Sequence, residues 1–422
     1  MTEAISSAKP DTNSLPPKTP TPSVKRLALS LGALVAIGPF AIDTYLPALP
    51  TMAADFASTT AAVERSVSLY LIGAAIGQLF AGPISDKYGR STVATLGLTM
   101  FALASIAISM INSVWMLDIL RVIQALGGGV TVITSGATVR DHFEGREAAK
   151  MITSIGLVML IAPLVAPAVG TLLIHLGGWR LIFVMLAAYA LLLMAIVRYA
   201  LPKPTTARSS VIDTSGLIHR WKRVISYRPG AALIICNGFC FSAFFAFITD
   251  SAFLYLEFYQ VDKNWFPILF GANVVAMLAF NRLNAVLLRH YDSHKIMLSG
   301  LVGIWIGGFV LLGQFLLFGK PPLVTVVPNI MLVGGLVALT MPNGIASLLH
   351  LFPKDAGTAS GLSGAGQFMI AGGCGVLVSI FHNHTPIPMA LVIFVSATIA
   401  LLARLYGGAK HDMAEQAPGQ EV

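Results

Sequence analysis

The sequence predicts an all-α membrane protein whose twelve transmembrane helices form two six-helix bundles, with both termini on the inner side of the membrane. Three observations support this prediction: an apolar composition, twelve apolar runs long enough to cross a bilayer, and basic residues sorted into alternate connections. Of the 422 residues, 56% are hydrophobic and 11% are charged, whereas about 25% of a soluble domain is charged. The mean hydropathy is +0.78.

The helices are predicted from runs of roughly 20 residues or more, the length that crosses a hydrocarbon core about 30 Å thick. The runs of the first half lie at 27–47, 65–84, 92–111, 115–138, 151–174 and 179–201. Those of the second half lie at 229–256, 266–288, 295–317, 323–349, 356–380 and 387–406.

A polar, basic and proline-flanked segment at 202–228 separates the two sets of helices and is predicted to be a cytoplasmic linker. It divides the chain into an N-terminal bundle at 25–201 and a C-terminal bundle at 229–407. The connections DKYGRSTV and RHYDSHKIM are weakly similar and lie about 200 residues apart, which suggests an internal repeat. Paired repeats place a substrate site between the bundles, near the membrane midplane.

The chain ends are predicted to be tails. Residues 1–24 contain five prolines and no apolar core, so we expect a disordered segment rather than a cleaved signal peptide, and a first apolar run that is retained as a helix. Residues 408–422 form the C-terminal tail. The cysteines all fall in predicted helices, so no disulfide is expected; they are Cys236, Cys240 and Cys374.

The basic residues are distributed by side. With the N-terminus placed inside, 22 of the 27 Lys and Arg residues fall in inner segments and four fall in outer loops. This pattern matches the excess of positive charge that membrane proteins carry on their inner side. It accounts for the net charge of +8 without a nucleic-acid partner.

The segment GPISDKYGR follows the second predicted helix and is predicted to be a short inner turn. Gly82 allows close helix approach, Gly89 permits a tight turn, and Asp86 is able to meet a helix N-terminus or a nearby cation. With Arg90, which ends the segment, these residues are the candidate gating residues. An ordinary charged loop is the alternative. Pairs of glycines four residues apart either form a sliding contact between the halves or pack within one half; they are Gly73 with Gly77 and Gly357 with Gly361.

The fourth helix carries LRVIQALGGG, in which Arg121 and Gln124 lie three residues apart and therefore on one face. An arginine facing lipid costs several kcal/mol, so Arg121 is expected to face water or a partner. A structural ion pair is the alternative. Gln124 is a candidate substrate contact.

The fifth helix carries IAPLVAPAVG, where Pro163, Pro167 and Gly170 interrupt hydrogen bonding along the helix. We interpret them as a conformational element of this helix; a kinked helix without mechanistic meaning is the alternative.

An acid interrupts the apolar first helix in AIDTYLPALP. Asp43 lies roughly 25 Å from the inner end of its helix, and Arg121 lies about 10 Å and Asp118 about 6 Å from the outer face, so the three share a similar depth. Desolvation favours a neutral Asp43 and a guanidinium favours a charged one. We therefore predict that Asp43 exchanges protons, with Arg121 and Asp118 as coupling residues; Asp118 is also placed to neutralise Arg121. A helix-end cap is the alternative.

The seventh helix adds a further acid, Asp250, preceded by Phe247. Asp250 is either a second protonation or cation-binding group or, in the reading the sequence slightly favours, a group at the wet outer end of its helix. Phe247 is a candidate for the substrate cavity or for packing. His382 and His384 lie close together in an outer loop, which alone is poor evidence for a metal, and no metal site is predicted.

Together, IDTYLPALP, GPISDKYGR, RVIQALGG, VRDHFEGREAAK and IAPLVAPAVG resemble the bicyclomycin and chloramphenicol resistance branch of the drug:proton antiporters in the major facilitator superfamily. The similarity covers the first half; the second half matches in layout and in AGTASGLSGAGQF. The resemblance implies that the acid at Asp43 and the arginine at Arg121 take part in proton and drug coupling, and that the GPISDKYGR segment is a cytoplasmic latch. Ala125 and Ala162 replace glycines of the family pattern.

The predicted function is proton-driven export of small amphipathic drugs across a bacterial inner membrane by a monomer that needs no cofactor. The alternative is a proton-coupled carrier dedicated to one metabolite, by nutrient uptake or by nucleoside or siderophore export. The motifs HExxH, GxSxG and GxxxxGK[ST] are absent, so the sequence predicts neither an enzyme nor ATP-driven transport.

Overall fold

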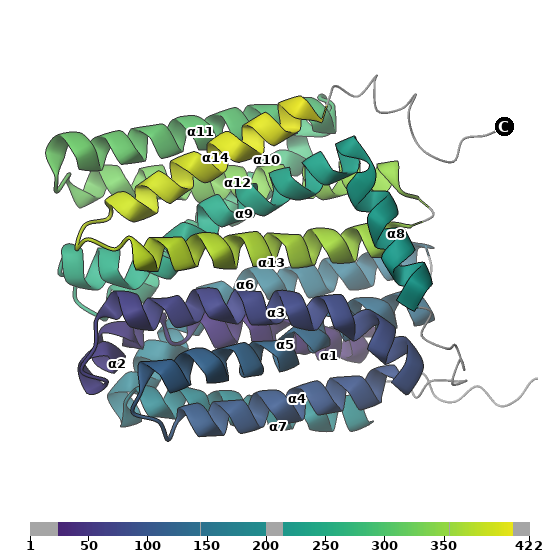
Figure 1. Cartoon of the computed structure of the whole chain (residues 1–422), viewed down its shortest axis with the longest axis horizontal. Coiled ribbons are helices and arrows are strands. Elements are labelled where there is room, and N and C mark those ends of the chain that lie inside the picture. Colours follow the sequence, from purple (N-terminus) through teal and green to yellow (C-terminus); the bar gives the residue numbers. More distant parts are fainter. Residues whose placement is uncertain (1–23, 144, 200–213, 354, 408–422) are drawn as a thin grey trace, which may run out of the picture.

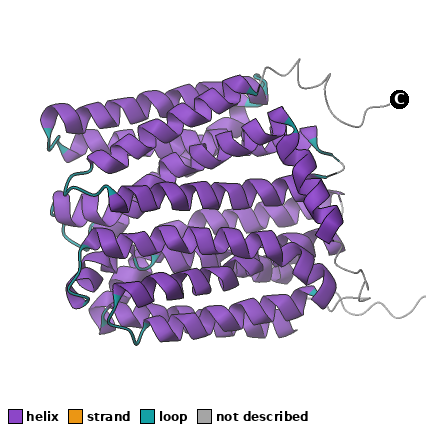
Figure 2. Cartoon of the chain, in the orientation of Figure 1, coloured by secondary structure: helices purple, strands orange, loops and turns teal. Residues whose placement is uncertain are grey.

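A computed structural model of the protein describes residues 24–143, 145–199, 214–353 and 355–407. These residues are helical apart from short connections (Figure 2). Twelve helices are long and apolar enough to cross a membrane, which confirms the predicted number of spans. Both predicted tails lie outside the described residues, except that the first helix begins at Val24.

The spans of the first bundle are α1 (Val24–Asp43), α3 (Thr60–Tyr88), α4 (Arg90–Ile108), α5 (Val114–His142), α6 (Gly145–Gly177) and α7 (Trp179–Tyr199). Between α1 and α3 lie the 3₁₀ turn η1 (Leu46–Ala48) and the short helix α2 (Leu49–Asp55). The spans of the second bundle are α9 (Arg228–Ala252), continued by the π-helical η2 (Phe253–Phe258), α10 (Phe266–Leu287), α11 (Ser293–Phe318), α12 (Leu323–Leu351), α13 (Ala356–Ile380) and α14 (Ile387–Tyr406).

The two bundles lie side by side, with α3 and α13 running along each other where they meet (Figure 1). A second junction joins α6 to α10. The helix α1 begins and α14 ends at the same end of the molecule, which we call the terminal end; the opposite end, with the turns after α2, α4 and α6, is the far end.

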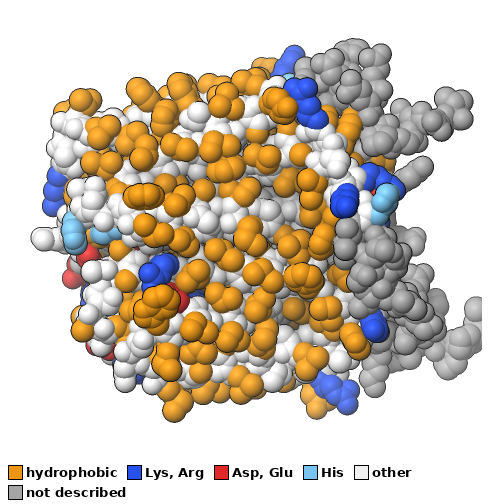
Figure 3. Space-filling view, viewed as in Figure 1, with side chains coloured by type: hydrophobic (Ala, Val, Ile, Leu, Met, Phe, Trp, Pro, Cys, Tyr) orange, Lys and Arg blue, Asp and Glu red, His pale blue; other side chains and the backbone are white. Residues whose placement is uncertain are grey.

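Hydrophobic side chains cover the face shown in Figure 3 along the length of the helices, whereas most of the Lys and Arg side chains visible there lie toward the terminal end. Large apolar residues such as Leu103, Leu191 and Leu402 are exposed. In water such a surface is unfavourable. Its extent is explained by contact with lipid.

Glycines of α13 allow the two bundles to approach closely. A Cβ on Gly372 would lie 2.8 Å from the backbone carbonyl oxygen of Ser68 on α3, and one on Gly375 would lie 2.2 Å from its hydroxyl oxygen. Real Cβ atoms do not come this close. The junction therefore depends on the missing side chains at these two positions.

For Gly73 and Gly77 the sequence left two alternatives open, a sliding contact between the halves and packing within one half. A Cβ at these positions would lie 2.6 Å and 2.5 Å from the carbonyl oxygens of Val122 and Leu126, both on α5 of the same bundle. The alternative, packing within one half, is the one the structure has. Gly361 has no atom within 4 Å of its would-be Cβ.

The sequence predicts a short inner turn for the whole segment GPISDKYGR, but in the structure most of this segment is helical. The helix α3 continues to Tyr88, Gly89 alone forms the turn with φ of 88°, and α4 begins at Arg90. The reason is that only one residue has to adopt positive φ, which glycine does without steric cost. Pro83 is accommodated inside the helix.

Two further expectations for this segment concern Gly82 and Asp86. No atom lies within 4 Å of a would-be Cβ on Gly82, so this glycine does not serve a close helix contact here. The side chain of Asp86 lies outside the described residues. Arg90 donates from Nη1 to the Ser85 hydroxyl oxygen at 3.1 Å, which ties the start of α4 to the end of α3.

Part of the predicted linker is helical. The helix α8 (Thr214–Ser226) lies beside α9 and α13, and Arg223 forms an ion pair of 3.1 Å with Asp355 in the turn between α12 and α13. Val224 is buried. The described end of the linker is therefore attached to the second bundle. Residues 200–213 lie outside the described part of the chain.

Candidate functional site

The first helix breaks at its acid. The helix α1 ends at Asp43, and the chain passes through Thr44 and Tyr45 into η1, where Pro47 lacks the N–H that a continuing helix needs. Asp43 is 4% exposed, and among the described residues its carboxylate has neither a hydrogen bond nor an ion pair. The break therefore holds an acid inside the first bundle without a fixed partner.

The proline-rich part of α6 packs against this break. Pro163 and Pro167 lie within a helix that remains continuous from Gly145 to Gly177. A Cβ on Gly170 would lie only 1.7 Å from the carbonyl oxygen of Thr44, the residue after Asp43. Only glycine fits there. The break after Asp43 is therefore in contact with α6, the helix that also forms the second junction between the bundles.

Arg121 is fully buried on α5 and is held by polar and aromatic groups. Its Nη1 donates to Gln124 Oε1 at 2.6 Å, and Gln124 Nε2 donates to the Ser105 hydroxyl oxygen at 2.7 Å. The guanidinium carbon lies 4.3 Å from the ring centre of Tyr45 and 4.4 Å from that of Tyr70. Two aromatic faces therefore stabilise the cation.

This arrangement leaves part of the arginine unsatisfied. Arg121 Nε and Nη2 are buried and have no hydrogen-bond partner among the described residues. The ion pair with Asp43 that equal depth made possible does not form in this conformation. Two side chains at equal depth in the membrane meet only if their helices also turn them toward each other. That direction is set by helix packing, which the depth of a residue does not determine.

The sequence suggested that Asp118 neutralises Arg121, but in the structure Asp118 has a different partner. It forms an ion pair with Arg65, whose Nη2 lies 2.6 Å from Asp118 Oδ2. The pair borders a groove of about 370 Å³ that also includes Trp115. Arg65 lies in the second turn of α3. Because Asp118 is paired with Arg65, it is not the counter-ion of Arg121.

The two aromatic faces on Arg121 lead to a prediction about Tyr70. Replacing it by Leu removes one cation–π contact, worth about 2 kcal/mol when desolvated, whereas Phe keeps the ring. We expect Tyr70→Leu to lower the thermal unfolding temperature of the purified protein and Tyr70→Phe to leave it nearly unchanged. Equal losses in the two variants would show that the hydroxyl group, and not the ring, matters at this position.

The acid on α9 is not at a wet helix end, and that reading of the sequence is wrong. Asp250 is 1% exposed, because η2 continues the span beyond it and covers the far end. Phe247 is packed, with its ring centre 6.1 Å from that of Phe270 and 6.0 Å from that of Tyr255. In this conformation Phe247 belongs to an aromatic cluster of the second bundle.

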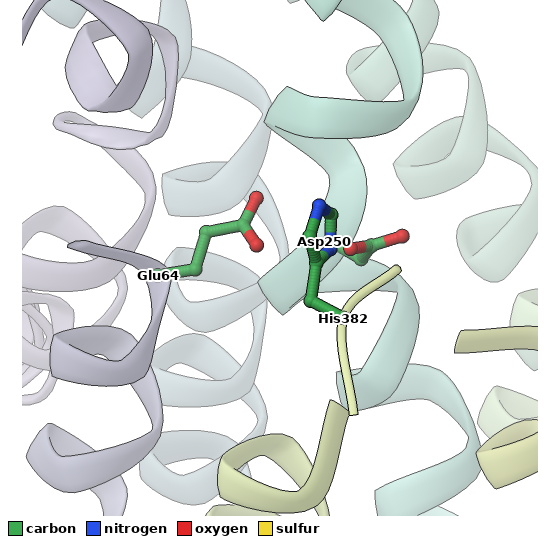
Figure 4. A group of neighbouring side chains, drawn as sticks. All are labelled: Glu64, Asp250 and His382. Atoms are coloured by element: carbon green, nitrogen blue, oxygen red, sulfur yellow. The ribbon is translucent and has the colours of Figure 1, made fainter. Parts of the chain in front are cut away.

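A buried acid on α3, Glu64, was not among the site residues predicted from the sequence. Glu64 is 0% exposed and lies near Asp250 and His382, although the three come from segments far apart in the chain (Figure 4). The predicted span began at residue 65, because a charged residue ends an apolar run. In the structure the helix begins at Thr60, so Glu64 is inside it.

Comparison with known proteins identifies the relatives of this chain. The family described as the Major Facilitator Superfamily matches residues 29–373. The bicyclomycin resistance protein homolog of Haemophilus influenzae is 30% identical over 383 residues, which cover 89% of this chain and 94% of that protein. The chloramphenicol resistance protein of Pseudomonas aeruginosa is 26% identical over 390 residues, 90% of each chain.

The fold is also known from solved structures. The xylose transporter XylE from E. coli, in a partially occluded inward-open conformation, is similar with a TM-score of 0.66 over 91% of this chain and 97% of that chain. The sequence identity is 15%. At this level the likeness concerns the fold alone, and it confirms the predicted two-bundle architecture.

Proposed function

Because this chain belongs to the Major Facilitator Superfamily, we propose that it is a proton-coupled antiporter that exports small amphipathic drugs or related compounds. As a member of this family it is a secondary transporter that binds a small-molecule substrate within the membrane, and it is not an enzyme. Its resistance-protein relatives support export. Asp43 is the proton-carrying group in this proposal, and Arg121 with Gln124 contacts the substrate.

One observation carries the proposal: the first bundle buries an acid and an arginine that do not satisfy each other. An unpaired buried charge costs several kcal/mol. A proton removes that cost for Asp43, and an acceptor group supplied by the substrate, or by Asp43 in another conformation, removes it for Arg121. The proton that neutralises Asp43 and the substrate that contacts Arg121 are the two species that this transporter moves. A proton crossing about 100 mV contributes about 2.3 kcal/mol, which is available to drive export.

Alternating access requires the bundles to separate at one end at a time. Among the described residues, three side-chain hydrogen-bond contacts join the bundles at the far end: Thr60 donates to Glu257, Lys263 Nζ to the Thr51 hydroxyl oxygen at 3.3 Å, and His175 Nε2 lies 3.2 Å from Asn264 Oδ1. The far end is thus closed here. We place it on the outer side of a bacterial inner membrane, since Lys and Arg concentrate in the connections at the other end.

The test uses a bacterial host without its own drug exporters. Expression is expected to raise the minimum inhibitory concentrations of chloramphenicol or bicyclomycin. In inverted vesicles loaded with protons, addition of an exported drug is expected to release protons, measured with a pH-sensitive dye. Uptake of the drug into right-side-out vesicles, stimulated by an acidic exterior, contradicts export and favours a carrier that imports one metabolite.

A further inference from the structure

Three potential ligands meet where the two bundles touch at the far end. Glu64 comes from α3 of the first bundle, Asp250 from α9 of the second bundle, and His382 from the connection between α13 and α14 (Figure 4). One side-chain oxygen or nitrogen of each lies within 4.8 Å of those of the other two. None of these residues belongs to the site around Asp43 and Arg121.

The two carboxylates are buried without partners. Glu64 is 0% and Asp250 is 1% exposed, and none of their four oxygens has a hydrogen-bond partner in the described parts of the chain. Acceptor groups in this condition normally find a donor or a cation. The neighbouring Glu257 is a further acid and already accepts a hydrogen bond from Thr60. The cluster therefore offers several carboxyl oxygens, and no donor or cation among the described residues satisfies those of Glu64 and Asp250.

We propose that Glu64, Asp250 and His382 bind a divalent transition-metal ion of the Zn²⁺ type and that this ion joins the two bundles at the far end. Two carboxylates, one imidazole and a doubly charged cation give a neutral site, which removes the cost of burying the acids. An imidazole ligand favours Zn²⁺ or Ni²⁺ over Mg²⁺ and Ca²⁺, which prefer oxygen alone.

The geometry needs a small adjustment to accommodate the ion. Ligand atoms about 2.1 Å from a tetrahedral Zn²⁺ lie about 3.4 Å from one another. The present separations of up to 4.8 Å therefore close by up to about 1.4 Å through side-chain rotation. A position for water remains, as in zinc sites with three protein ligands.

His382 is suited to the role by its surroundings. Its ring packs edge-on against Phe253, with the ring centres 4.4 Å apart, which orients the imidazole. Partial burial, and secondarily the nearby His384, lower the pKa of His382 below its usual value. In its neutral form an imidazole oriented in this way offers a ring-nitrogen lone pair to a metal.

The site exists only while the far end is closed, because Glu64 moves with the first bundle and the other two ligands stay with the second. A metal that binds only the closed form multiplies the ratio of closed to open protein by 1 + [metal]/Kd. This factor is about 100 when the metal concentration is 100 times Kd. We therefore expect Zn²⁺ to hold the far end shut and to slow transport. This goes beyond the export function and does not depend on which compound is carried.

The test is calorimetric titration of ZnCl₂ into the purified full chain, prepared without a polyhistidine tag, treated with EDTA and free of drug. We expect one saturable Zn²⁺ per chain. Glu64→Gln and His382→Ala are expected to weaken binding at least about tenfold, since even groups behind the ligands change metal affinity by that much. His384→Ala is the matched control, because it removes the adjacent histidine of the same exposed connection.

A second measurement addresses the bundle contact. Zn²⁺ is expected to slow hydrogen–deuterium exchange at the start of α3 and in η2 of the wild type and of His384→Ala, but not of His382→Ala. Absence of saturable Zn²⁺ or Ni²⁺ binding overturns the proposal, as does equal binding by wild type and Glu64→Gln. Since no transport is measured, these outcomes are independent of whether the protein exports drugs.

Discussion

Asp43→Asn is expected to abolish proton-coupled export while the protein stays folded in the membrane. Asparagine has nearly the size of aspartate but does not exchange a proton. Asp43 has no hydrogen bond or ion pair among the described residues, so the substitution breaks no contact that holds the fold. Drug-induced proton release from inverted vesicles is expected to fall to the level of vesicles without the protein, and resistance of the host is expected to be lost.

The control for this variant is Asp55→Asn on α2. Asp55 accepts hydrogen bonds from Trp179 and Arg180 at the far end, and its ion pair with Arg180 is solvent-exposed and worth at most about 1 kcal/mol. We expect it to retain proton release. An Asp43→Asn protein that still releases protons on addition of drug removes Asp43 from the coupling mechanism and leaves Asp118, Asp250 and Glu64 as the buried acids to examine.

The fold was predictable because a bilayer imposes length and polarity on every span. Apolar runs and the distribution of Lys and Arg are local features, so twelve helices follow from them. The ends of the helices were less predictable. A charged residue ends an apolar run but not a helix, which is why α3 begins before Glu64 and continues to Tyr88.

The site was predictable only in part. The sequence singled out Asp43 and Arg121, since polar groups in apolar helices are costly and need a reason. It did not identify Tyr70, which packs on the guanidinium, nor the association of Arg65 with Asp118. These contacts depend on the rotation of each helix about its axis. A span that is apolar on most sides gives little indication of that rotation.

The junction between α3 and α13 leads to a second variant with a large expected effect, Gly372→Val. A Cβ at this position would lie 2.8 Å from the carbonyl oxygen of Ser68 and 2.7 Å from Cγ1 of Ile72. The backbone carbonyl has no rotamer by which to move away. Overpacking of this kind costs about 1–3 kcal/mol, which reduces the population of the closed far end by about 5- to 150-fold.

Gly373→Val is the matched control, because no atom lies within 4 Å of a would-be Cβ on Gly373. Both variants place the same side chain on the same helix and have equal effects on its propensity. We expect only Gly372→Val to lose transport and to exchange deuterium faster at the start of α3, since each bundle keeps its own packing while the junction opens. Equal exchange and equal transport in the two variants mean that closure of the far end does not depend on this contact.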